Sequence, residues 1–255
     1  MSTLSLLLII VTAIISIVFP IGFIVHVKKK YGASLVYFWA GIIVFTIVQI
    51  VIRIPLIQWM SGQLWFSVHI GSNKVLAILF LSLTAGIFEE VGRFVAFRYI
   101  LFNNRKWQNG IAFGIGHGGI EAVTMVGINY LSFIIIALNV NFQWFNGLVA
   151  IIPNAGTVTN LLMDIYPSVF LFAGIERFFV MIIHMGLSVF VLNGVRMGRT
   201  SHLFYAIAFH TILNCSIIFT SVHIWLVEVI VGIAALICVF YIQKQKRLKI
   251  SKIGD

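Results

Sequence analysis

The residues of this 255-residue chain that could do chemistry lie inside its most apolar segments. A carboxylate or an imidazole can act as a general acid or base, and both can bind a metal ion. Because a buried charge is costly unless it is paired, we expect these side chains to contact one another or to line a cavity. They are Glu89, Glu90, Arg93, His117, Glu121, Glu176, Arg177, His184, His210 and Glu228.

The composition indicates which elements must position these side chains. Hydrophobic residues make up 61% of the chain and charged residues 9%, so its polar surface is too small to cover a water-soluble domain. This excludes a soluble enzyme, a disordered chain and a disulfide-bonded secreted domain. We therefore predict an all-α integral membrane protein, a polytopic helical bundle that forms one domain over residues 1–255.

Seven apolar segments are long enough to cross a bilayer, which takes about 20 residues per helix. A motif-bearing core is expected at about residues 75–220, followed at the end of the chain by a basic tail at 244–255. The expected spans are residues 4–27, 33–57, 75–102, 107–130, 168–195, 202–220 and 223–243.

Basic residues fall at every second junction between these segments. Such residues mark the cytoplasmic ends of membrane helices, so we expect the N-terminus outside and the basic tail in the cytoplasm. A nucleic-acid-binding protein would gather its charge on one soluble face. Despite the net charge of +10, we therefore expect the lipid bilayer, and no nucleic acid, as a partner. The clusters are Lys28–Lys30, Arg105–Lys106, Arg196 with Arg199, and residues 244–252.

The sequence after the fourth segment allows several structures. Apolar sequence continues beyond Tyr130 to Leu138, so residues 131–160 could hold a continuing bent helix, a re-entrant outer element with Pro153 and Gly156, or an eighth span. An eighth span would place the later basic clusters outside, against the charge pattern. We therefore predict seven spans.

Seven polar residues on four predicted helices share one depth in the membrane. Counted at about 1.5 Å per residue from the basic helix ends, they lie roughly 12–21 Å deep. Since an ionisable group near a helix centre costs about 2.5–3.5 kcal/mol in a bilayer, we expect one shared cavity, open toward the cytoplasm. These layer residues are Glu89, Glu90, Arg93, His117, Glu121, His184 and His210.

Spacing along each helix agrees with a shared cavity. Residues four positions apart lie on the same helical face, so each helix presents one polar pair to the interior. The pairs are Glu89 with Arg93, His117 with Glu121, His184 with Ser188, and His210 with Asn214.

Four further ionisable residues need a separate explanation. Glu176, Arg177 and Glu228 lie near the outer ends of their segments, where we expect interfacial or structural pairs. Arg53 precedes Pro55 and is expected to extend to the membrane surface or to pair structurally.

The polar segments contain four motifs: Glu89-Glu90-Val91-Gly92-Arg93, Phe113 four before His117, Glu176-Arg177 with His184, and His210 four before Asn214. These motifs resemble those of the YhfC family, which is grouped with the PrsW and CAAX-endopeptidase (ABI) intramembrane proteases. Two residues separate Glu90 from Arg93, as in the PrsW and YhfC branches, whereas CAAX endopeptidases have three. The resemblance implies hydrolysis of a peptide or membrane-protein substrate within a bacterial plasma membrane.

One hypothesis for this chemistry needs no metal ion. Peptide hydrolysis requires an activated water and donors for the developing oxyanion. Glu89 or Glu90 would act as general base and share the water with His117. His210 and Asn214, one helical turn apart, would donate hydrogen bonds to the oxyanion.

A second hypothesis uses a metal ion. His117, His184 and His210 would bind one Zn²⁺ that keeps an open position for water, with a glutamate as base or fourth ligand. The positive charge of Arg93 beside Glu89 slightly favours the metal-free hypothesis.

Two other classes of function fit the same layer of residues. A non-catalytic membrane scaffold should tolerate Glu89→Gln, because a neutral side chain of the same shape still packs. A proton-coupled transporter could use glutamates and histidines as a relay, but such proteins usually carry inverted repeats, and the sequence shows none.

Overall fold

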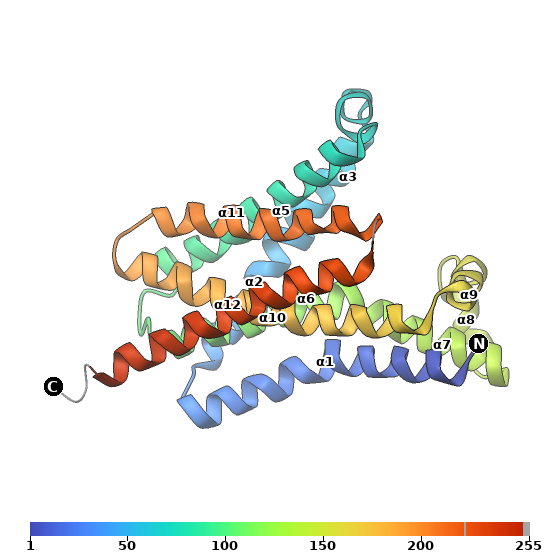
Figure 1. Cartoon of the computed structure of the whole chain (residues 1–255), viewed down its shortest axis with the longest axis horizontal. Coiled ribbons are helices and arrows are strands. Elements are labelled where there is room, and N and C mark those ends of the chain that lie inside the picture. Colours follow the sequence, from blue (N-terminus) through green and yellow to red (C-terminus); the bar gives the residue numbers. More distant parts are fainter. Residues whose placement is uncertain (222, 252–255) are drawn as a thin grey trace.

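The chain folds as a bundle of membrane-spanning helices (Figure 1). The structure is a computed structural model that describes residues 1–221 and 223–251. These residues form helices and connections without a strand, and seven helices are long and apolar enough to cross a membrane. The prediction of an all-α multi-pass membrane protein with seven spans is therefore confirmed.

Several spans combine more than one helical segment. Segments η1 to η4 are π-helical and η5 is a 3₁₀-helix. The spans are α1 (Thr3–Tyr31); α2, η1 and α3 (Leu35–Phe45, Thr46–Arg53, Ile54–Ser61); α5 and η3 (Lys74–Val95, Ala96–Ile100); α6, η4 and α7 (Trp107–Ala122, Val123–Gly127, Ile128–Phe142); α10 (Pro167–Arg196); α11 and η5 (Ser201–Cys215, Ser216–Ser221); and α12 (Ile224–Ser251). Short elements in the connections are α4 (Leu64–Phe66), η2 (Ser67–Gly71), α8 (Asn146–Ile151) and α9 (Ala155–Asp164).

The basic clusters gather at one end of the bundle. In Figure 1 the connections after α1, η3 and α10 and the C-terminal part of α12 lie at the end opposite the N-terminus. We call this the basic end and the other the N-terminal end. Lys28–Lys30 and Arg196 occupy the last turns of α1 and α10, where a positive charge also interacts favourably with the helix dipole. Which end faces the cytoplasm stays a prediction from the charge pattern.

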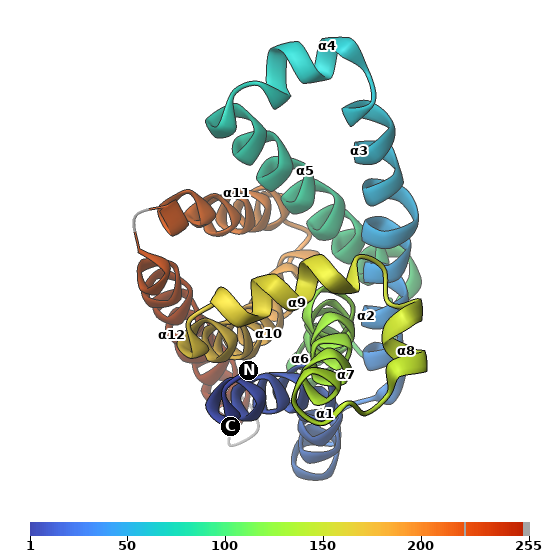
Figure 2. The same cartoon turned by 90° about the vertical axis from the view of Figure 1, so that its right-hand side faces the viewer.

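Residues 131–160 continue the fourth span and then form short helices. The span runs unbroken from Trp107 to Phe142, a length of 36 residues, so the alternative of a continuing helix is confirmed and the span ends at Phe142 rather than near residue 130. The π-helical segment η4 lies within it and adjusts the helix without ending it. Helices α8 and α9 follow at the N-terminal end and are too short to cross a bilayer, which excludes an eighth span here (Figure 2).

Close backbone packing holds α6 between two neighbouring helices. Glycines let membrane helices approach closely, because no side chain separates the backbones. A Cβ atom added at Gly114 would lie 2.4 Å from Met185 Cα in α10, and one added at Gly116 would lie 2.0 Å from the Phe38 carbonyl oxygen in α2. Since His117 follows Gly116, these two contacts fix its position in the bundle.

Substitution of Gly116 tests this packing. We expect Gly116→Ala to lower the free energy of unfolding by about 1–3 kcal/mol or more, because the methyl group overlaps the Phe38 carbonyl group. Gly22→Ala in α1 is the matched control, since a Cβ atom there meets nothing within 4 Å. Thermal unfolding in detergent should show a lower midpoint for Gly116→Ala alone, and equal midpoints for both variants would contradict the close approach of α2 and α6.

Candidate metal centre

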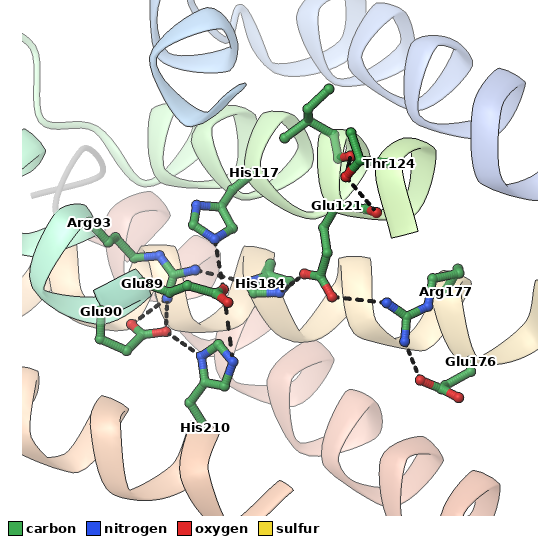
Figure 3. Close-up of polar contacts among 11 residues, drawn as sticks. Glu89, Glu90, Arg93, His117, Glu121, Thr124, Glu176, Arg177, His184 and His210 are labelled. Atoms are coloured by element: carbon green, nitrogen blue, oxygen red, sulfur yellow. Dashed lines mark hydrogen bonds and ion pairs between the residues drawn. The ribbon is translucent and has the colours of Figure 1, made fainter. Parts of the chain in front are cut away.

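The seven layer residues contact one another in a buried network (Figure 3). Helix α5 contributes three of them, α6 two, and α10 and α11 one each. All are buried except Glu121, which is partly exposed. The equal depths estimated from the sequence therefore correspond to contact in space.

Arg93 is the central cation of this network. Its guanidinium group is fully buried and donates to both carboxylate oxygens of Glu90. Its Nη2 lies 2.8 Å from His184 Nδ1, and His210 Nδ1 lies 2.9 Å from Glu90 Oε1. The predicted pairing of Arg93 with Glu89 is wrong, because residues three apart also share a helical face and Glu90 takes this position.

Three of the buried side chains could hold a metal ion together. Glu89, His117 and His184 each offer one ligand atom, and these atoms lie within 4.8 Å of one another. His117 Nε2 is 3.0 Å from Glu89 Oε2. His210, the third histidine of the set expected from the sequence, is not part of this group. Its Nδ1 lies 2.9 Å from Glu90 Oε1 and its Nε2 lies 3.8 Å from Glu89 Oε2.

Glu121 links this group to a second arginine. Its Oε2 lies 2.7 Å from His184 Nε2, and its Oε1 accepts a 2.9 Å hydrogen bond from Arg177, which also pairs with Glu176. Glu121 therefore contacts His184 rather than His117, the partner expected from spacing. Arg177 and Glu176 form a pair, as expected, but they join the layer because a long arginine side chain spans the difference in depth.

The charge and the ligand types of this network fit a divalent cation. Its four carboxylates outnumber its two guanidinium groups, which leaves two negative charges that such a cation would offset. Imidazole and carboxylate ligands suit Zn²⁺. The carboxylates are Glu89, Glu90, Glu121 and Glu176, and the cations are Arg93 and Arg177.

A cavity of about 470 Å³ leads from Glu89 and His184 toward the N-terminal end. Glu89 and His184 line its inner part, and Ser82 lines it closer to the N-terminal end. The expected opening toward the basic end is wrong. There, one helical turn beyond the layer, the fully buried rings of Phe97 and Phe113 pack with centroids 4.6 Å apart and fill the space.

Arg53, Glu228 and Asn214 also line this cavity. Arg53 is buried and donates to Thr84 Oγ1 at 3.1 Å and to the Leu81 carbonyl oxygen at 2.6 Å, so of the two expected alternatives it pairs structurally and does not extend to the surface. Glu228 Oε2 has no hydrogen bond, and no cation of the described chain lies within 4.0 Å, so its expected pair is absent. Arg53 was not expected to line the cavity, although the position of a charged residue in an apolar segment was a signal for it.

Cysteine labelling tests the direction of the cavity. Ser82 lines it, whereas Ser188 is buried on the basic side of His184 and does not. With Cys215 and Cys238 replaced, a membrane-impermeant methanethiosulfonate added outside intact cells should modify Ser82→Cys and leave Ser188→Cys unmodified. The opposite pattern, or modification of Ser82→Cys only in inside-out vesicles, would contradict a cavity open to the cell exterior.

A double-mutant cycle tests the pair of Arg93 and Glu90. Removing one partner leaves a buried charge, so Arg93→Gln or Glu90→Gln should each cost about 3–5 kcal/mol of unfolding free energy. Together they should cost much less than the sum of the two. Arg98→Gln, at an exposed position of η3, is the control and should change stability by less than about 0.5 kcal/mol. The free energies come from chemical unfolding in mixed micelles. If the loss in the double variant equals the sum of the two single losses, Arg93 and Glu90 do not form this pair.

Comparisons with known proteins identify the family of this chain. A family model described as YhfC intramembrane metalloprotease matches residues 15–235. A Bacillus subtilis (strain 168) protein named "Uncharacterized membrane protein YhfC" is 32% identical over 256 residues, which cover 92% of this chain and 93% of that protein. No solved structure matches the chain. The chain belongs to the YhfC family.

Proposed function

We propose that this protein is a metal-dependent peptidase that hydrolyses a peptide bond of a membrane-associated substrate within the bilayer. The observation that carries this proposal is the buried group of Glu89, His117 and His184, of which Glu89 and His184 line the cavity. The description of the matching family as an intramembrane metalloprotease supports the same chemistry.

Glu89, His117 and His184 are the residues that would hold the ion. When bound there, a Zn²⁺ ion would polarise the substrate carbonyl group and make a water molecule acidic enough to react near neutral pH. The charge of Arg93, which favoured a metal-free site in the sequence, does not oppose an ion, because Glu90 takes that charge up.

Arg93 and Glu90 are positioning residues in this proposal. A guanidinium group only donates hydrogen bonds, so its contact with His184 Nδ1 orients that ring and places the proton of the neutral ring on Nε2. This proton must leave before Nε2 binds an ion. Glu90 holds Arg93 on one side and His210 on the other. Both carboxylate oxygens of Glu90 are occupied by Arg93, which leaves this residue unsuited to accept a proton from water.

We assign the role of general base to Glu121. Arg177 binds its Oε1 and fixes the carboxylate group, while its Oε2 lies 2.7 Å from His184 Nε2. Glu121 Oε2 takes a proton from the attacking water and returns it to the leaving amine nitrogen as the C–N bond breaks. This transfer leaves the carboxylate in its starting state.

His210 and Asn214 lie one helical turn apart on α11 and line the same cavity. The Asn214 amide donates to the substrate carbonyl oxygen as negative charge develops on it. The apolar side chains Ile183, Leu187 and Leu213 line the walls around them and keep the environment poor in water, which strengthens such hydrogen bonds.

Metal analysis combined with two kinds of variant tests the proposal. Purified protein should bind one equivalent of zinc, and a strong chelator should remove both metal and cleavage of membrane peptides. Glu89→Gln and His117→Ala should lose zinc. Glu121→Gln should keep zinc but lose about 10²–10⁴-fold in rate, the usual contribution of a general base.

Glu228→Gln is the matched control, because Glu228 lines the cavity without contacting the metal group, and this variant should keep both zinc and rate. Cleavage that survives in zinc-free protein, or full activity of Glu121→Gln, would contradict the proposal. The substrate for this assay comes from comparing membrane peptides of cells with and without the protein.

A further inference from the structure

Arg53 lies in the cavity wall with a charge that no neighbouring carboxylate takes up. It ends the π-helical segment η1, and its side chain is 8% exposed and lines the cavity. Its hydrogen bonds go to two neutral acceptors, Leu81 O and Thr84 Oγ1. Its Nη1 has no hydrogen-bond partner in the described part of the chain, and no described carboxylate lies within 4.0 Å of the guanidinium group.

The guanidinium group of Arg53 cannot become neutral by losing a proton. A buried glutamate, such as Glu228 on α12, can take up a proton and become neutral, whereas a guanidinium group keeps its charge at any physiological pH. Glu89 acts on Arg53 only from beyond ion-pair distance, and in the proposed function Glu89 is a metal ligand. The remaining source of a counter-charge is a ligand in the cavity.

We propose that Arg53 binds a carboxylate group of the substrate and thereby selects substrates that carry one. This inference rests on the proposed function, since it assigns a specificity residue to the same cavity. The planar guanidinium group suits a carboxylate, and charge-assisted hydrogen bonds of this kind are the strong ones in proteins.

The place of Arg53 along the cavity sets the position of that carboxylate. Leu81 and Thr84, which bind Arg53, precede Glu89 on α5 by five to eight residues. At 1.5 Å per helical residue, Arg53 binds roughly 8–12 Å from the metal group, toward the N-terminal end. An extended peptide spans about 3.3–3.6 Å per residue, so the carboxylate lies about three residues from the bond that is cleaved.

Either the free C-terminus of a peptide or an acidic side chain can supply this carboxylate. We would measure binding of Ac-Leu-Ala-Leu-Leu as the free acid and as the amide, and of Ac-Leu-Ala-Leu-Glu-amide against its Gln counterpart. The full-length protein is kept in phosphatidylcholine nanodiscs and freed of metal by chelation, so that no carboxylate binds to an ion. Calorimetry reports the Kd without any hydrolysis.

We expect at least one carboxylate peptide to bind about tenfold or more tightly than its neutral partner, the usual effect of a hydrogen bond to a charged group. A difference in Kd between the free acid and the amide identifies the C-terminus as the source of the carboxylate, and a difference between the Glu and Gln peptides identifies an acidic side chain. Arg53→Gln should abolish the preference, and Arg53→Lys should retain part of it. Lys74→Gln, an exposed cation at the same end of the bundle, is the control and should keep the full preference.

Equal affinities in both pairs for the wild-type protein would overturn the proposal whether or not any variant folds. A preference that survives in Arg53→Gln would also overturn it. Because binding is measured in metal-free protein, failure of the proposed peptidase activity does not affect this test. Conversely, an active protein that binds acids and amides equally would be a peptidase without this carboxylate site.

Discussion

A fully buried guanidinium group determines the arrangement of this protein's interior. Arg93 cannot lose its charge, so the membrane interior must supply acceptors for it, and Glu90 and His184 do so from two different helices. Each acceptor holds a further group: Glu90 binds His210, and His184 contacts Glu121. One cation thus connects α5, α6, α10 and α11 in a single polar network.

Packing of α6 and α10 makes this network possible. Buried residues fill most of α6 along its length, and 72% of the span window of α10 is buried, the highest share among the spans. Gly114 removes the side chain that would separate these two helices. The histidines at 117 and 184 therefore approach with ring centroids 4.7 Å apart, close enough to share one ion with Glu89.

The sequence predicted the spans and the polar layer, because both depend on apolar length and helical rise. It did not predict which layer residues pair. Spacing places Glu89 and Glu90 on adjacent faces but does not specify which of them Arg93 binds. Depth counted along the backbone also separated Arg177 from Glu121, although an arginine side chain bridges that distance. The cavity direction depends on where Phe97 and Phe113 fill space, which requires the tertiary packing.

X-ray absorption at the zinc edge would show whether Glu89, His117 and His184 bind one metal ion. We expect a zinc ion with two imidazole nitrogens and carboxylate or water oxygens at about 2.0–2.2 Å, and the loss of one imidazole in His117→Ala. A sulfur ligand, or a spectrum unchanged in His117→Ala, would mean that any bound zinc lies elsewhere and that these three residues do not bind it.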